Sequence, residues 1–202
     1  MKHLKMFTLL ILAFTIDASK VHHKSKCPDL KPMSGFKIEQ LLGNWHLKMI
    51  AYKNDRTVKE SCFKNNHSLE DSNTLRMDIE YYLSNGTIFR RTQRRQIDHS
   101  RPGVFLSQSE RTLYGVFGNT YQKNVTTESI VLYIDSDLEL RYACTQLDHF
   151  WYSEADYSYY ISIKNRNFDS ISKLVPLFEK IKAIPEDLNK LHFLMNDLSC
   201  TN

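Results

Sequence analysis

The chain has 202 residues, of which 42% are hydrophobic and 25% are charged, and its formal net charge is +4. This length predicts a single domain with enough chain to bury a core. A net charge this small argues against a nucleic-acid partner.

A short apolar run, Met6 to Ile16, follows a basic start and precedes the small residues Ala18 and Ser19. This pattern is typical of a secretory signal peptide rather than a buried N-terminal helix, so we assign residues 1–18 to the signal peptide and 19–202 to one domain. No later stretch reaches the ~18 apolar residues that a membrane helix needs. The sequence therefore predicts a secreted, extracellular protein without a transmembrane segment.

Three Asn-X-Ser/Thr triplets begin at Asn66, Asn85 and Asn124. Such triplets accept glycans only on the surface of a secreted chain. Together with the leader they predict a glycoprotein.

The chain has four cysteines: Cys27, Cys62, Cys144 and Cys200. An even number in an oxidising compartment predicts two disulfides, and the spacing by itself leaves all three pairings open. Because no Cys-x-x-Cys pair is present, we expect no metal site.

Most of the chain after Gly43 shows the period-two alternation of β-strands. We expect eight strands, at residues 45–51, 60–70, 75–83, 87–97, 110–118, 129–135, 138–146 and 159–164. Asn85-Gly86 is a strong hairpin signal, and most of the other connections are short and polar. An antiparallel meander of this kind favours an all-β, eight-stranded up-and-down barrel over a two-sheet sandwich, because closure removes unpaired edges.

Helical periodicity is found only near the C-terminus. Apolar residues in 171–178 follow helical spacing, although Pro176 can instead start that helix. We expect this helix to pack outside the barrel. Residues 184–195 can form a second short helix that begins near Pro185.

The stretch "GNWHL", Gly43 to Leu47, resembles the Gly-x-Trp motif that opens the first strand of lipocalins. The surrounding residues 27–62 are similar to the opening of apolipoprotein D and the insect bilin-binding lipocalins, and the four cysteines occur in the same order. Asp135 matches the acidic residue of a second family motif, although the Thr and Tyr beside it are missing. Lys164 or Arg166 matches the basic residue of the third.

This resemblance implies that Trp45 fills the floor of the barrel with a basic residue over its ring. It also implies the disulfide pairing Cys27–Cys144 and Cys62–Cys200.

Inward positions of the alternating strands are expected to line a ligand cavity, although some of them can simply pack together. The candidates are Leu47, Met49, Leu75, Met77, Ile79, Tyr81, Leu113, Phe117, Leu132, Leu138, Leu140 and Tyr142. Since most are apolar, they favour a small hydrophobic ligand such as a lipid, fatty acid, sterol, retinoid, carotenoid or bilin-type pigment, with no other cofactor.

Two further segments depart from a simple cavity wall. Arg91 and Arg95 share one phase of their strand, and they either bind a ligand carboxylate at the mouth or lie on a solvated face. Residues 150–160 are rich in aromatic side chains, and form either a rim around the mouth or a loop packed on the barrel end.

These features predict a secreted carrier of one small hydrophobic molecule, with lipid or pigment transport implied by the resemblance. No motif of a hydrolase, metalloprotease or phosphate-binding loop is present, so we expect no enzyme. A haem or biogenic-amine scavenger is an alternative, but haem needs an inward histidine, and we place His67, His99 and His149 in loops or at strand ends. An extracellular signalling ligand that binds a cell-surface receptor, or a protein with peripheral lipid contact, remains open.

Overall fold

The computed structural model describes residues 26–52, 60–83, 85–115, 119–149, 152–164, 176–177, 179 and 192–195. Nearly all of the regular structure is β. The elements are α2 (Ile38–Leu41), β1 (Gly43–Tyr52), β2 (Glu60–Leu69), β3 (Thr74–Leu83), β4 (Ile88–Ile97), β5 (Val104–Tyr114), β6 (Thr120–Ile134), β7 (Leu138–Asp148), β8 (Ser153–Ile163) and β9 (His192–Met195).

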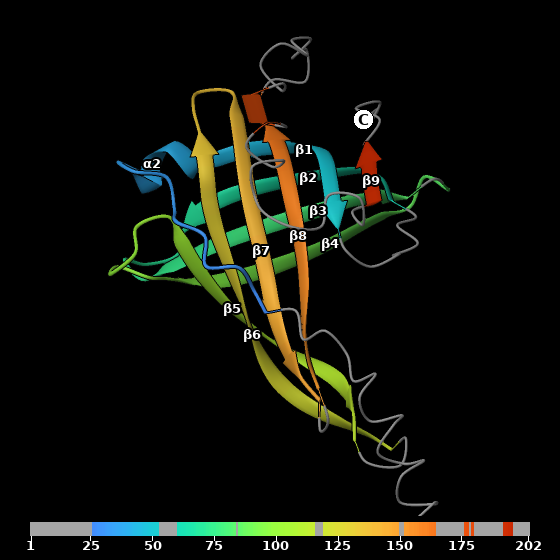
Figure 1. Cartoon of the computed structure of the whole chain (residues 1–202). Coiled ribbons are helices and arrows are strands. Elements are labelled where there is room, and N and C mark those ends of the chain that lie inside the picture. Colours follow the sequence, from blue (N-terminus) through green and yellow to red (C-terminus); the bar gives the residue numbers. More distant parts are fainter. Residues whose placement is uncertain are drawn as a thin grey trace, which may run out of the picture.

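Strands β1 to β8 form a closed antiparallel barrel (Figure 1). Consecutive strands from β2 to β8 pair with one another, and β1 pairs with both β2 and β8, which closes the sheet. Closure leaves no edge between the first and last strands. The predicted eight-stranded up-and-down barrel is confirmed.

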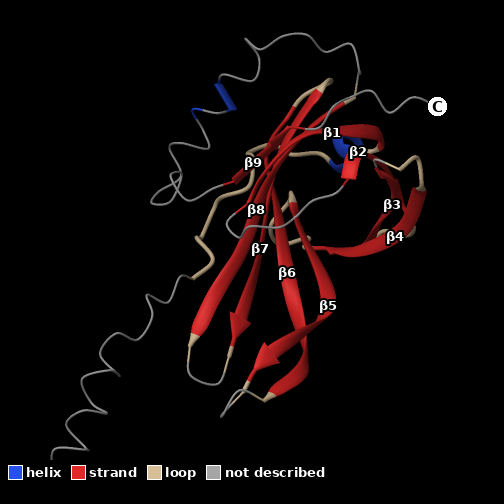
Figure 2. Ribbon diagram, turned by 90° about the vertical axis from the view of Figure 1, so that its right-hand side faces the viewer, coloured by secondary structure: helices blue, strands red, loops and turns tan. Residues whose placement is uncertain are grey.

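Two of the strand pairings in the barrel are much shorter than the others. Strand β1 pairs with β2 only from Gly43 to His46, and β4 pairs with β5 only at Gln96 and Ile97. Beyond these short seams, β2–β4 curve away from β5–β8, whose far ends extend past them (Figure 2). Both seams lie toward the end that carries α2, so this end of the barrel is the closed one.

Three strands are longer than their apolar alternation predicts. Strand β6 begins at Thr120 with exposed polar residues, and β8 begins at Ser153 with half-buried polar ones, whereas β5 begins at Val104 with apolar residues that the prediction left out. In β6 and β8, backbone pairing extends through these polar residues without a continuous apolar face to mark it. The prediction that residues 150–160 form a rim or loop is therefore wrong for 153–160, which belong to β8.

The C-terminal region differs from the expected pair of helices. Pro176, Leu177 and Glu179 are helical, and Leu177 is buried against the outside of the barrel. The predicted second helix is wrong at its end, because His192–Met195 form strand β9 on β1. Where β2 leaves β1, the backbone of Met49–Tyr52 needs a new partner, and β9 supplies it.

The segment before α2 crosses the outside of β5–β7 (Figure 1). Cys27 forms a disulfide with Cys144 on β7, as the resemblance implied. Further along, the Met33 amide donates to the Val131 carbonyl at 2.9 Å. The Cys62–Cys200 pairing lies outside the described residues, since neither side chain is among them.

Candidate functional site: the inner face of the barrel

Trp45 lies at the closed end of the barrel and is fully buried. Its indole Nε1 donates to the Leu41 carbonyl of α2 at 2.7 Å. Lys164 Nζ lies 4.8 Å from the centre of the Trp45 ring and donates to the Gln40 carbonyl at 3.2 Å. The indole is thus packed, hydrogen-bonded and covered by a cation. Of the two basic candidates, Lys164 takes this position, whereas Arg166 lies outside the described residues.

The other two motif residues shape the backbone around this floor. Gly43 has φ +100°, a conformation that favours glycine, where the chain turns from α2 into β1. One carboxylate oxygen of Asp135 accepts bonds from the amides of Asp137 and Leu138, both at 2.8 Å, and so holds the turn between β6 and β7. Asp135 therefore acts on the backbone of a turn.

Strand register shows which side chains share the inner face with Trp45. Trp45 is opposite Asn65, Asn65 is opposite Ile79, and Ile79 is opposite Arg91. The same face of β3 and β4 carries six further residues: Leu75, Met77, Tyr81, Phe89, Gln93 and Arg95. Five of the expected cavity residues, Leu47, Leu75, Met77, Ile79 and Tyr81, thus face inward, and register extends this face along β5 to Leu113.

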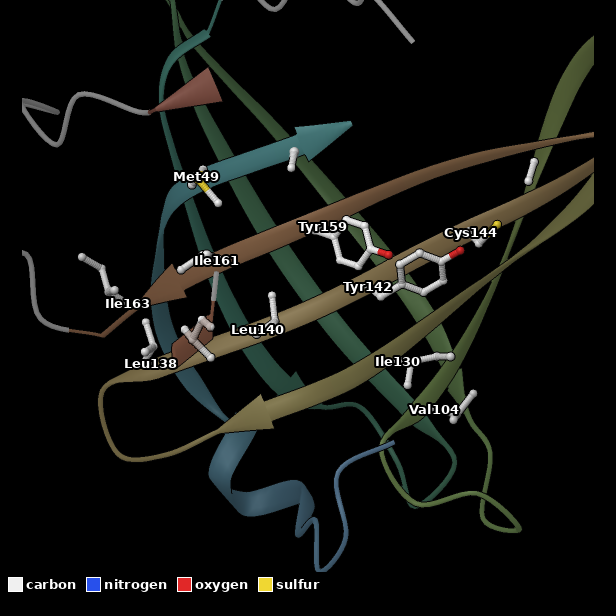
Figure 3. Packing of buried hydrophobic residues seen from close by; sticks show 13 residues of the cluster. Met49, Val104, Ile130, Leu138, Leu140, Tyr142, Cys144, Tyr159, Ile161 and Ile163 are labelled. Atoms are coloured by element: carbon white, nitrogen blue, oxygen red, sulfur yellow. The ribbon is translucent and has the colours of Figure 1, made fainter. Parts of the chain in front are cut away.

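The remaining described candidates lie on the opposite face. Four of them, Met49, Leu138, Leu140 and Tyr142, pack in one cluster with Cys144 (Figure 3). Because Cys144 is bonded to the segment that crosses the outside, this face of β7 points out of the barrel. A register shift between Leu47 and Met49 moves Met49 to the outer face of β1. The prediction that these residues line the lumen is corrected accordingly.

The two other predicted cavity positions are Leu132 and Phe117. Leu132 lies at an irregularity of β6 between Val131 and Tyr133, and it packs against the same outer cluster. Phe117 lies outside the described residues. Within β8, Tyr159 also packs with Tyr142, their ring centres 5.0 Å apart.

Because the apolar face of β7 points outward, the charged side chains of this strand point into the barrel. Glu139 and Arg141, which alternate with the outward apolar residues, are 0% and 3% exposed. Arg141 Nε lies 3.6 Å from a Glu139 carboxylate oxygen, and the Arg141 guanidinium lies 5.6 Å from the centre of the Tyr160 ring. Sequence reasoning missed this pair because an apolar phase was taken as the inward one.

The two arginines of β4 differ in their surroundings. Arg91 is exposed, whereas Arg95 is buried and donates from Nη2 to the Gln93 side chain at 3.2 Å. Burial, followed by the nearby Arg141, lowers the pKa of Arg95 below its usual range. The guanidinium stays protonated at neutral pH. Arg95 is therefore neither at the mouth nor solvated.

His67 also faces this interior. It lies on β2 opposite Met77, two residues before the strand ends, and is 2% exposed, so the expectation that it does not face inward is wrong. Burial and the charges of Arg141 and Arg95 hold the pKa of His67 well below its ordinary value. The imidazole is neutral at pH 7. His99 lies in a turn and His149 at the end of β7, as expected.

Several interior polar atoms lack a hydrogen-bond partner within the described part of the chain. They include side-chain atoms of Asn65, Arg95, Ser129, Glu139, Arg141 and Ser162. A buried polar group left in this state costs about 1–3 kcal/mol, so native proteins usually satisfy such groups. The inner face therefore has unused capacity for polar contacts, next to the apolar wall of β3.

The three glycosylation candidates, Asn66, Asn85 and Asn124, are all exposed. Among the described residues, no group of three or more His, Cys, Asp or Glu side chains is placed to hold a metal ion. No helix of the described ranges is long and apolar enough to cross a membrane.

No protein-family model and no curated protein matches the chain. Among solved structures, lobster apocrustacyanin A1 is 13% identical, with a TM-score of 0.53 over 85% of this chain and 94% of that chain. The tryptamine complex of the Rhodnius prolixus amine-binding protein is 12% identical, with a TM-score of 0.58 over 83% and 85%. The cockroach allergen Per a 4 is 12% identical, with a TM-score of 0.55 over 85% and 96%.

The fold is that of the lipocalins. At these identities the likeness establishes the lipocalin architecture alone. The nearer resemblance to apolipoprotein D, drawn from residues 27–62, stays a prediction.

Proposed function

We propose that this chain is a secreted lipocalin that carries one small molecule with a large apolar part inside its barrel. The observation that carries the proposal is the composition of the inner face. The apolar row of β3 lies beside buried polar atoms that lack partners among the described residues. A core that only packs against itself rarely leaves such groups.

The barrel geometry supports the same function. One end is sealed by Trp45, whereas β2–β4 separate from β5–β8 toward the other end. Two of the similar structures are an apocrustacyanin and an amine-binding protein in complex with tryptamine. A binding role for the present chain, without catalysis, agrees with both.

Secretion and glycosylation belong to this proposal. The apolar leader, the Cys27–Cys144 disulfide and the exposure of all three sequon asparagines support export through an oxidising compartment. Expression in a secreting eukaryotic cell, followed by enzymatic removal of N-glycans, should lower the apparent mass. An unchanged mass would contradict the proposal that the protein is glycosylated.

Native mass spectrometry of the secreted protein tests the carrier function. We expect a complex of one chain with one small molecule, which organic extraction removes. Ile79→Trp, on the inner face, should reduce occupancy because it fills the interior, whereas Thr92→Trp, on the exposed outer face of β4, should not. Equal occupancy in both variants would contradict binding in the barrel.

Haem binding is a second candidate, favoured by His67 alone. A neutral, inward imidazole is a suitable iron ligand. Added haem should then give a Soret band that His67→Ala shifts. An identical spectrum in that variant would exclude His67 as the ligand.

A further inference from the structure

Arg95 carries a buried positive charge that is not balanced locally. Its side chain is 9% exposed, and its Nε and Nη1 atoms have no hydrogen-bond partner in the described residues. The one hydrogen bond that it makes within the described residues runs from Nη2 to the neutral amide oxygen of Gln93. A buried charge without a counter-charge is strongly unfavourable, so native proteins pair such groups.

The carboxylate that could balance the charge of Arg95 already forms an ion pair with another arginine. Glu139 faces Arg141 at 3.6 Å, and its influence on Arg95 is weaker than that of Arg141. His67 is neutral and adds no charge. The cluster of Arg95, Glu139, Arg141 and His67 therefore holds two positive charges and one negative charge, which leaves one positive charge in excess.

We propose that Arg95, with Arg141 beside it, binds the carboxylate of an amphipathic ligand whose apolar tail lies along β3. This inference rests on the proposed carrier function and names the class of its ligand. Arginine suits a carboxylate because its planar fork donates two parallel bonds. The Nε and Nη1 atoms of Arg95, which have no hydrogen-bond partner in the described ranges, are the donors for such a contact.

The direction of the ligand follows from the register. Arg95 is opposite Leu75, near the closed end, and Met77, Ile79 and Tyr81 succeed one another along β3 toward the hairpin that joins it to β4. The ligand thus enters with its carboxylate first, and its apolar chain extends back toward the open end. Arg91, on the same face but exposed, lies along the entry path.

The test compares three probes of equal chain length on delipidated protein: dodecanoate, its methyl ester and dodecylamine. We expect wild type to bind dodecanoate at least about tenfold more tightly than the ester, which is the low end for charge-assisted hydrogen bonds. Arg95→Gln should bring the affinity for dodecanoate down to that for the ester and leave the ester unchanged. Arg90→Gln is the matched control, because Arg90 pairs with Glu80 on the exposed outer face of the same strand.

Folding does not confound this comparison. Arg95→Gln removes an unbalanced buried charge, so its thermal midpoint should be at or above that of wild type. The affinity of Glu139→Gln for dodecanoate provides a second test. Without the competing carboxylate, this variant should bind dodecanoate more tightly than wild type does.

The alternative outcomes are distinct. Equal binding of dodecanoate and ester to wild type, or a preference that survives in Arg95→Gln, would overturn the anion site and leave the carrier function standing. Tighter binding of dodecylamine would identify Glu139 as the polar contact and also overturn the site. Binding of none of the three probes would count against the carrier function as well.

Discussion

Strands β3 and β7 show the same alternation of apolar and charged residues, but the barrel orients them in opposite ways. On β3, Met77 faces inward, and Asp78 faces the solvent. On β7, Leu140 faces outward into a buried cluster, and Arg141 faces the interior. A period-two pattern separates two faces of a strand, but it does not say which of them is inside.

What covers the outer face decides the orientation. The segment that contains Cys27 crosses the outside of β7 and is tied to it through Cys144, so apolar residues there are buried as well as those in the lumen. Nothing comparable covers β3 in the described residues, and its outer face carries exposed ion pairs such as Arg76–Asp78. Because the apolar residues of β7 are buried on the outside of the barrel, its inner face can carry polar residues.

The largest expected effect comes from removing the tether of this cover. The disulfide joins residues 117 positions apart, so Cys27→Ala with Cys144→Ala should lower the free energy of unfolding by about 4–5 kcal/mol on the chain-entropy estimate. Denaturant unfolding of the double variant measures the loss.

Hydrogen exchange then locates the effect. Protection from exchange should fall most in residues 26–33 and in β7. The amides of β3 should lose no more protection than the decrease in global stability accounts for. A uniform loss in both strands would show that the cover does not distinguish them.

A smaller effect is expected from the buried ion pair, and it sharpens the contrast between inside and outside. Glu139→Ala leaves Arg141 and Arg95 buried without a carboxylate, which should cost about 3–5 kcal/mol. Glu70→Ala, which breaks the exposed Glu70–Arg94 pair, should change stability too little to resolve. Thermal unfolding of both variants provides the comparison.

A double variant separates charge from packing. Glu139→Leu with Arg141→Met replaces the pair by apolar side chains, and should recover most of the stability that Glu139→Ala loses. If it stays as unstable as Glu139→Ala, the loss comes from packing rather than from unbalanced charge.

Much of the fold could be predicted from the sequence, because local patterns carry it. The alternation over 75–83, the Asn85-Gly86 turn and the surroundings of Trp45 each depend on neighbouring residues. The motif predicted that either Lys164 or Arg166 covers the Trp45 ring, and the structure shows that Lys164 does.

The candidate site was harder to predict because its orientation depends on contacts distant in the sequence. Arg141 faces inward because segments distant in the sequence, among them the one that contains Cys27, pack against the apolar outer face of β7. Met49 left the predicted face through an irregularity that the sequence does not mark. His67 was misplaced because β2 has no clear alternation, although it lies two residues after Asn65 on the same face.

The smallest effect concerns the pH dependence of stability through His67. Because burial and two arginines lower its pKa in the folded protein, the unfolded chain, with a pKa near 6.5, takes up a proton first as the pH falls. The stability from His67 is therefore complete above about pH 6.5 and declines as the pH falls toward the folded-state pKa. By linkage, the free energy of unfolding should therefore decrease as the pH is lowered from 7.5 to 5.5.

Denaturant unfolding between pH 7.5 and 5.5 measures this loss, and His67→Phe should abolish it. His99→Ala is the matched control, since His99 is exposed and its ring faces the Asn73 side chain at 2.8 Å. Asp98, which lies beside His99, does not titrate in this window, because its bonds from Ser100 and Arg101 lower its pKa to about 2. A slope that persists in His67→Phe would assign the pH dependence to another group and leave the interior of the barrel without a titrating histidine.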